Sequence, residues 1–330
     1  MRGKGSNATV GTSLAPGWDS PLARLVPYVF AITTGYRILT YLVVSHAGIG
    51  FDARLYTAAA RAWLQGQDPW SVTNLGIHFG APPPTLLVFA PFVFLPDLVV
   101  SVAWIVGSFA LAAIALRSVR MPLWWLIFWP IVDGAMVGNP DVAILSLLVI
   151  ARGRLALIAP ILKVYAFVPL IGERRIRTVA AAAAILVLTA PILPWTVWLA
   201  DLPVISDRLA SASATTSVFG NVPLMLVGAV ALAMLGLRRA GWLAVPILWP
   251  STQPHYLAMS VPALSPWLAI AWSFPHPLIM VSSVVVEVIV RHQRTWSIPY
   301  LFARLKRRPT DIDHAADIPP TSRRATDPPT

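Results

Sequence analysis

The sequence predicts an all-α integral membrane protein, a polytopic helical bundle with about nine to eleven membrane segments. Of its 330 residues, 57% are hydrophobic and only 12% are charged, and the mean hydropathy is +0.69. A soluble domain carries about 25% charged residues. The apolar residues also gather in long runs that lack the alternation of strands. Because lipid offers the backbone no hydrogen bonds, these runs are predicted to be helices and not the strands of a barrel.

The distribution of charge agrees with a membrane topology. The formal net charge is +11, which in a soluble protein would suggest a nucleic-acid partner. Here the arginines lie in short gaps between apolar runs or after the last run, at Arg117, Arg120, Arg152, Arg154, Arg174, Arg175, Arg177, Arg238, Arg239 and within 304–308. This is the positive-inside pattern of cytoplasmic loops, so no nucleic-acid partner is expected. The chain has no cysteine, which excludes disulfides and thiolate chemistry.

The N-terminal part sets the predicted orientation. Residues 1–21 are polar and Gly/Ser-rich, and we expect them to form a disordered cytoplasmic leader. The first span is expected at 22–45, and the basic residues before it place its N-terminus inside. The stretch 47–84, the longest polar stretch between spans, is then an outer loop with helical character.

Further apolar segments are expected at 85–95, 98–116, 122–137, 142–151, 155–171, 179–199, 222–237, 242–250, 256–272 and 278–290. The first of these is either a crossing or a half-helix. Gly138-Asn139-Pro140-Asp141 lies between the segments 122–137 and 142–151. Basic clusters flank 155–171, so this segment is expected to enter and return with a turn near Lys163, or to cross once against the charge rule.

Two stretches are predicted to lie outside the apolar bundle. Residues 201–220 form a second polar loop. Residues 291–330 form a basic and then Pro/Asp-rich tail with the composition of a disordered segment. The membrane domain is therefore predicted to span 22–290.

The outer loop carries the first candidate for chemistry. Asp52 opens a helix-like stretch too polar to cross a membrane, and it shares a helical face with Tyr56 at i and i+4. An acid and a phenol on one face suit a sugar at the membrane surface. The alternative is an interfacial helix that starts at Ala53 with Asp52 as its N-cap. His78 lies in the same loop, either as a substrate ligand or as an ordinary surface residue.

Later polar residues supply further candidates. Lys163 is the only lysine inside an apolar run, and it either meets a lipid phosphate or extends from a helix end to the interface. His255 lies in a polar gap before Tyr256, either as a base or phosphate ligand or as a structural histidine. Asn139 and Asp141, with Asp133, cluster at the helix break, where they cap half-helices or line a polar cavity. No residues are spaced as metal ligands or as a nucleotide cradle.

Four stretches resemble the motifs of one known family. They are Phe51-Asp52-x-x-x-Tyr56 with Gly66-Gln67-Asp68-Pro69-Trp70, the break Gly138-Asn139-Pro140-Asp141, Lys163 followed by Pro169, and His255-Tyr256. In this order, over 24–268, they resemble glycosyltransferase family 87, the polyprenol-phosphate-mannose-dependent mannosyltransferases of the GT-C superfamily.

The resemblance implies a GT-C-type bundle in a bacterial plasma membrane with its active site facing outside. The donor would be a polyprenyl-phosphate sugar and the acceptor an envelope glycolipid or glycan, with no cofactor and no metal. Asp52 would be the general base of an inverting transfer, and Lys163 and His255 would stabilise the donor phosphate. We predict substrate-binding roles for Tyr56, Asn139, Asp141, His78 and Tyr256.

Two other classes of function remain open. A multi-span transporter or flippase would explain the polar residues within apolar runs, which are Arg37, Asp133, Lys163 and Glu287. The lack of a clear internal repeat weighs against it. A non-catalytic membrane scaffold is the third possibility.

Overall fold

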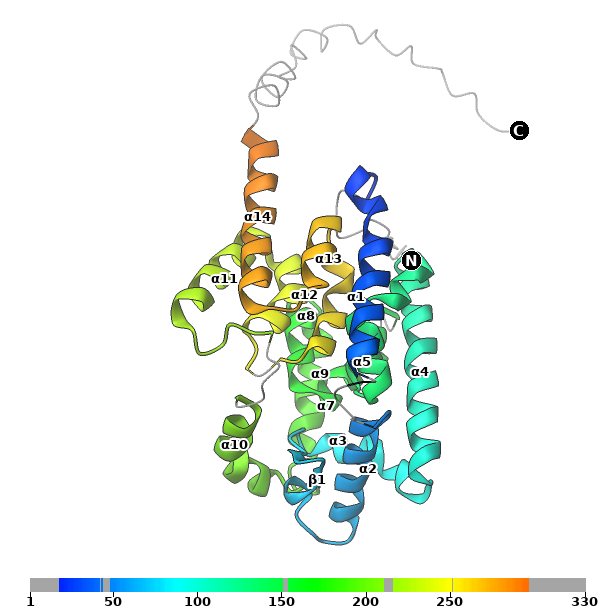
Figure 1. The fold of residues 1–330 in the computed structure, drawn as a ribbon. Coiled ribbons are helices and arrows are strands. Elements are labelled where there is room, and N and C mark those ends of the chain that lie inside the picture. Colours follow the sequence, from blue (N-terminus) through cyan, green and yellow to red (C-terminus); the bar gives the residue numbers. More distant parts are fainter. Residues whose placement is uncertain are drawn as a thin grey trace, which may run out of the picture. The chain divides into compact units, whose positions relative to one another are not determined.

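Helices make up nearly all of the regular structure in the computed structural model, which describes residues 18–41, 43, 48–150, 154–210, 216–250 and 252–296 (Figure 1). Within these residues the only strands are the short β1 (Thr73–Asn74) and β2 (Ile77–His78). The predicted all-α class is therefore confirmed. Contacts divide the chain into two compact units, Met1–Val288 and Ile289–Thr330. Residues 1–17 of the predicted leader and 297–330 of the predicted tail lie outside the described residues.

The α-helices are α1 (Val26–Thr40), α2 (Phe51–Leu64), α3 (Pro84–Phe89), α4 (Asp97–Ser118), α5 (Trp129–Val137), α6 (Asp141–Ile150), α7 (Ile158–Leu162), α8 (Phe167–Gly172), α9 (Ile176–Leu188), α10 (Trp195–Ala210), α11 (Val222–Met234), α12 (Leu237–Leu248), α13 (Pro266–Trp272) and α14 (Pro277–Trp296). The 3-10 helices are η1 (Pro21–Arg24), η3 (Pro69–Ser71), η4 (Ala90–Phe94), η5 (Leu123–Ile127), η6 (Arg154–Leu157), η7 (Val164–Ala166) and η8 (Pro254–Ala263).

Few of these helices have the length of a membrane span. Among the described residues only α4 is long and apolar enough to cross a bilayer, and α5 with α6 would make a second span if the pair is taken together. The pair is bent by 117° at its break. Three shorter apolar helices, Pro84–Phe94, Ile176–Leu188 and Val222–Met234, lie where the sequence predicts segments. The structure thus shows the helices at the predicted places but not the predicted number of full spans.

Two predicted segments differ from the structure, and in the first of them prolines divide the apolar run. The span expected at 256–272 is instead η8, with Pro262 inside it, followed by α13, which begins at Pro266. Proline lacks the N–H that a continuous α-helix requires. The predicted polar loop 201–220 begins inside a helix, since α10 runs to Ala210.

The N-terminus of α2 rests on the bend between α5 and α6. Gly50 donates its N–H to the carbonyl of Met136 at 2.8 Å. Gly138 ends α5 in the left-handed conformation, with φ of 77°, and a Cβ there would lie 2.8 Å from the Cβ of Ala53. Only glycine fits both the conformation and the close approach. This contact brings the start of α2 to the residues of the bend.

The strands form a small hairpin that is tied to the same end of α2. β1 and β2 pair antiparallel, with Thr73 opposite His78. Leu75 and Gly76 both have positive φ, as in the tight turns that connect two strands. The side chain of Asn74 donates to the carbonyl of Phe51 at 3.1 Å, so the hairpin braces the first residue of α2.

A second break lies where the sequence predicts a turn. Lys163 is extended, with φ of −150° and ψ of 127°, between α7 and η7. Thr85 on α3 donates its hydroxyl to the carbonyl of Leu162 at 2.8 Å, which takes up a backbone acceptor that the break leaves free. The interrupted helix therefore presents the side chain of Lys163 at a fixed place inside the bundle.

Candidate functional site

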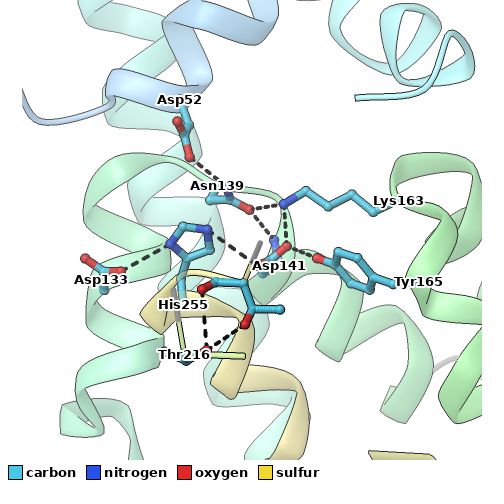
Figure 2. Close-up of polar contacts among 9 residues, drawn as sticks. Asp52, Asp133, Asn139, Asp141, Lys163, Tyr165, Thr216 and His255 are labelled. Carbon is cyan, nitrogen blue, oxygen red and sulfur yellow. Dashed lines mark hydrogen bonds and ion pairs between the residues drawn. The ribbon is translucent and has the colours of Figure 1, made fainter. Parts of the chain in front are cut away.

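Segments distant in sequence contribute polar side chains to one buried cluster (Figure 2). Asp52 comes from the start of α2, Asn139 and Asp141 from the α5–α6 bend, Lys163 from the break after α7, and His255 from the start of η8. Asn139, Asp141, Lys163 and His255 are buried, whereas Asp52 is partly exposed. The structure thus unites three of the residues that the sequence singles out for one site, Asp52, Lys163 and His255.

Asp52 is not a helix cap. The N-cap of α2 is Gly50, and the helix begins at Phe51, so Asp52 lies in its first turn. The interpretation of Asp52 as an N-cap before a helix starting at Ala53 is therefore wrong. Its Oδ2 instead accepts a hydrogen bond of 2.6 Å from Nδ2 of Asn139.

Asn139 sits at the centre of the bend and serves two purposes. Its Oδ1 accepts the backbone N–H of Asp141 at 3.2 Å, which supports the turn before α6. The same Oδ1 accepts a hydrogen bond of 2.8 Å from Nζ of Lys163. Since the oxygen is occupied in this way, the amide nitrogen faces Asp52.

Lys163 is held by several partners at once. Its Nζ donates to Oδ1 of Asp141 at 2.8 Å as well as to Asn139. The ring centroids of Tyr256 and Tyr165 lie 4.6 Å and 5.5 Å from the ammonium, within the range of cation–π attraction. A buried charge needs such compensation. The alternative of a lysine that extends to the surface is therefore wrong.

Asp141 is fully buried and anchors the other side of the cluster. Its Oδ1 accepts hydrogen bonds from Lys163 and from the hydroxyl of Tyr165. Its Oδ2 has no hydrogen bond within the described part of the chain but lies 3.7 Å from Nε2 of His255. Tyr165 is not among the residues that the sequence singles out. The available signal was its position directly after the break at Lys163, in the short η7 helix that follows.

His255 lies between two carboxylates. Its Nδ1 is 3.2 Å from Oδ2 of Asp133 on α5, and its Nε2 faces Asp141. Its ring stacks on Tyr256, with centroids 5.2 Å apart and an interplanar angle of 29°. The sequence placed Asp133 at the helix break without assigning it this partner.

Asp52 is the carboxylate of the cluster that pairs with neither Lys163 nor His255. Lys163 pairs with Asp141, and His255 pairs with Asp133. Asp52 receives only a neutral amide as its hydrogen-bond donor. Burial raises the pKa of the Asp52 carboxyl, and this outweighs the opposite effects of His255, the Asn139 hydrogen bond and Lys163. Asp52 therefore combines partial exposure with an increased affinity for a proton.

Of the other residues predicted to bind substrate, Tyr256 and Tyr56 lie at the cluster and His78 does not. Tyr256 joins the cluster through Lys163 and His255, and it is partly exposed. Tyr56 is buried against Phe79 and Phe89, with ring centroids 5.2 Å and 4.9 Å away, and burial raises the pKa of its hydroxyl. Lys163, Asp52 and Tyr256 all act electrostatically on that hydroxyl, so it lies beside the cluster. His78 is elsewhere, with Nδ1 at 3.2 Å from Nη1 of Arg208 on α10.

The cluster offers proton-accepting and hydrogen-bonding groups, and no set of metal ligands. Within the described ranges, no group of three or more His, Cys, Asp or Glu side chains is placed to hold a metal ion. The chemistry that these residues can supply themselves is general base catalysis at Asp52 and polar recognition around it.

Comparison with known proteins identified no relative of this chain. No model of a protein family matches the chain, and no curated protein or solved structure matches it either.

Proposed function

We propose that this chain is a membrane glycosyltransferase of GT-C type that moves a sugar, in the first instance mannose, from a polyprenyl phosphate to an acceptor hydroxyl on the outer face. One observation carries the proposal. Asp52 is the carboxylate of the described cluster that has no cationic partner, and it is also partly exposed. A carboxylate in this state can accept a proton, whereas Asp141 is paired with Lys163 and Asp133 is hydrogen-bonded to His255.

The proposed reaction is a single inverting displacement. Asp52 takes the proton from the acceptor hydroxyl as the acceptor oxygen forms a bond to the anomeric carbon. The bond from that carbon to the phosphate oxygen breaks, and the phosphate leaves with the electron pair. Because a phosphate monoester leaves without needing a proton, one base is enough and no paired acid is required.

Exposed apolar faces support a lipid environment, in which a polyprenyl donor is soluble. Exposed apolar side chains recur about every four residues along two helices, which is the spacing of a helical stripe. They are Tyr28, Ile32, Tyr36 and Leu39 on α1, and Leu98, Val102, Val106 and Ile114 on α4. Stripes of this kind are uncommon on soluble monomers and typical of contact with lipid or a partner. α4, with 22 residues, is about 33 Å long, which matches a bilayer core.

The phosphate roles of Lys163 and His255 remain predictions. Each side chain already has a carboxylate partner, Asp141 and Asp133 respectively. A donor phosphate would have to share these two side chains with the carboxylates. The substrate contacts of Tyr56, Tyr256, Asn139 and Asp141 also remain predictions, and of these four side chains only Tyr256 is partly exposed.

The test is sugar transfer by the purified full-length chain in lipid nanodiscs. Radiolabelled polyprenyl-phosphate sugars, mannose first, are offered with a panel of envelope glycolipids, and the products are separated by chromatography. Wild type should transfer sugar, and Asp52→Asn should transfer it about 10²- to 10⁴-fold more slowly. Asp97→Asn is the matched control, because Asp97 also lies in the first turn of a helix but is exposed.

Two outcomes would overturn the proposal. In the first, Asp52→Asn transfers sugar at the rate of wild type. In the second, wild type transfers no sugar from any donor but moves a solute or a labelled lipid across proteoliposomes. The second result would favour the transporter or flippase class.

A further inference from the structure

The orientation of the Asn139 amide is fixed by its neighbours. An amide oxygen accepts hydrogen bonds, while the amide nitrogen only donates. Nζ of Lys163 and the backbone N–H of Asp141 both donate to Oδ1, at 2.8 Å and 3.2 Å. A flipped amide would face these two donors with a third donor and would turn its oxygen toward the carboxylate of Asp52. The observed orientation is therefore the only one that satisfies all of these groups.

Lys163 is itself held in place. Its ammonium pairs with Asp141 at 2.8 Å, and Asp141 is completely buried. The hydroxyl of Tyr165 donates to the same carboxylate oxygen. The backbone of Lys163 is extended at the break after α7, so the side chain leaves from a point that the surrounding helices fix. The ammonium thus has little freedom to follow a substrate.

We propose that Lys163 is a positioning residue that acts through Asn139 on Asp52, and not a ligand of the donor phosphate. By occupying the amide oxygen of Asn139, Lys163 turns the amide nitrogen toward Asp52 and holds the oxygen of the base in place. The inference rests on the proposed function of Asp52 as the base. The sequence suggests Lys163 as a ligand of an anion. In this proposal its side chain instead supports the carboxylate of Asp52.

The two roles of Lys163 predict different kinetics. A phosphate ligand contributes to donor binding, so its loss raises the KM for the donor. A positioning residue acts on the base, so its loss lowers kcat and changes the pH profile while the donor KM stays nearly constant. The Asn139 hydrogen bond lowers the pKa of Asp52, so its loss should move the acid limb of the profile to higher pH.

The experiment compares Lys163→Met, Asn139→Leu and the double variant in full-length protein in nanodiscs. We expect each single variant to lower kcat about 10- to 100-fold, the range for one hydrogen bond to a charged group, with a donor KM within about 2-fold of wild type. The double variant should resemble Asn139→Leu alone, because Lys163 acts through the amide. Asn139→Leu keeps the Lys163–Asp141 pair, so it tests the link without leaving a buried charge unpaired.

A second measurement does not depend on sugar transfer. The carboxyl of Asp52 is titrated by infrared spectroscopy, with Asp52→Asn as the reference for assignment. Its midpoint should rise in Lys163→Met and in Asn139→Leu. If Lys163→Met does not fold, Lys163→Met with Asp141→Asn removes both charges of the pair and should give a smaller rise, because Asp141 itself raises the pKa of Asp52.

Three results would overturn the inference. The first is a donor KM raised 10-fold or more in Lys163→Met with kcat and the acid limb unchanged, which would make Lys163 a phosphate ligand. The second is a double variant in which Lys163→Met lowers kcat, relative to Asn139→Leu alone, by as much as it does in wild type. The third is an unchanged Asp52 midpoint in both single variants. If wild type transfers no sugar, the proposed function fails, but the infrared titration still decides whether Lys163 acts on Asp52.

Discussion

Two buried ion pairs of this protein are built differently. Nη1 of Arg239 on α12 pairs with Oε1 of Glu287 on α14 at 2.7 Å. The hydroxyl of Ser265 donates to Oε2 of Glu287 at 2.7 Å, and Nε of Arg239 donates to the carbonyl of Ala263 at 2.9 Å. Both carboxylate oxygens of Glu287 therefore have donors. This network joins three parts of the chain, and we call it closed because both oxygens of its carboxylate accept hydrogen bonds.

The pair of Lys163 with Asp141 is open at both ends. On one side it continues through Asn139 to the partly exposed Asp52. On the other side Oδ2 of Asp141 has only the 3.7 Å approach of His255. A closed network fixes the positions of helices, whereas an open one can transmit a change of charge to a group that meets a substrate. We therefore expect the Arg239 network to contribute mainly to stability and the Asp52 cluster to carry the proposed chemistry.

The largest effect expected is on catalysis by Asp52→Asn. Removing the base should lower kcat about 10²- to 10⁴-fold, the usual contribution of general base catalysis. The midpoint of thermal unfolding should change little, since the carboxyl is partly exposed and forms one hydrogen bond. Transfer assays and unfolding curves on the same samples check both statements. A large loss of stability with normal activity in the folded fraction would assign Asp52 to the closed type of network.

Arg239→Met should give the opposite result. It breaks the buried pair of Arg239 with Glu287, and breaking a buried ion pair by removing one partner typically costs about 3–5 kcal/mol of unfolding free energy. The rate of transfer per folded molecule should stay within about 2-fold of wild type. Replacing Glu287 by Met as well should restore part of the stability, because the pair is then removed as a whole. A loss of transfer without a loss of stability would show that the two networks are not separate in function.

The pH profile tests the open cluster without any substitution. The base works only when it is ionised, and burial raises the pKa of Asp52 above its ordinary value of about 3.9. Activity should therefore fall on acidification at a higher pH than for an exposed aspartate. The acid limb of kcat/KM, measured with saturating acceptor, gives the midpoint. A limb at or below about pH 4 would contradict the position assigned to Asp52 in the cluster.

Tyr165→Phe should have a smaller effect. The change removes one of the two donors to Oδ1 of Asp141 but leaves Lys163 in place. The expected cost is about 1–3 kcal/mol of stability, with a modest loss of kcat because the lysine is held less firmly. Unfolding and transfer are measured on the same preparation. Normal values for both would indicate that the pair with Lys163 alone is enough to hold Asp141.

The sequence predicts the parts of the cluster that depend on local breaks. The break at Gly138 to Asp141 and the break at Lys163 are visible because glycine, proline and charged residues interrupt apolar runs. The pairing of His255 with Asp133 is not visible, since 122 residues separate the two and no local pattern records the contact.

The lengths of the helices predicted from hydropathy are too great. Hydropathy counts apolar residues, whereas prolines such as Pro262 decide where hydrogen bonding stops.

The smallest effect is expected for His78→Gln. The sequence predicts a substrate contact for His78, but its Nδ1 lies 3.2 Å from Arg208 of α10, and it contacts no residue of the cluster among those described. The variant should leave kcat and both KM values within about 2-fold of wild type, as expected for a surface contact. Asn74→Ala is the informative partner, because Asn74 of the same hairpin donates to the carbonyl of Phe51, next to Asp52. If His78→Gln raises the acceptor KM 10-fold while Asn74→Ala does not, the hairpin itself meets the acceptor, and the site extends beyond the cluster toward α10.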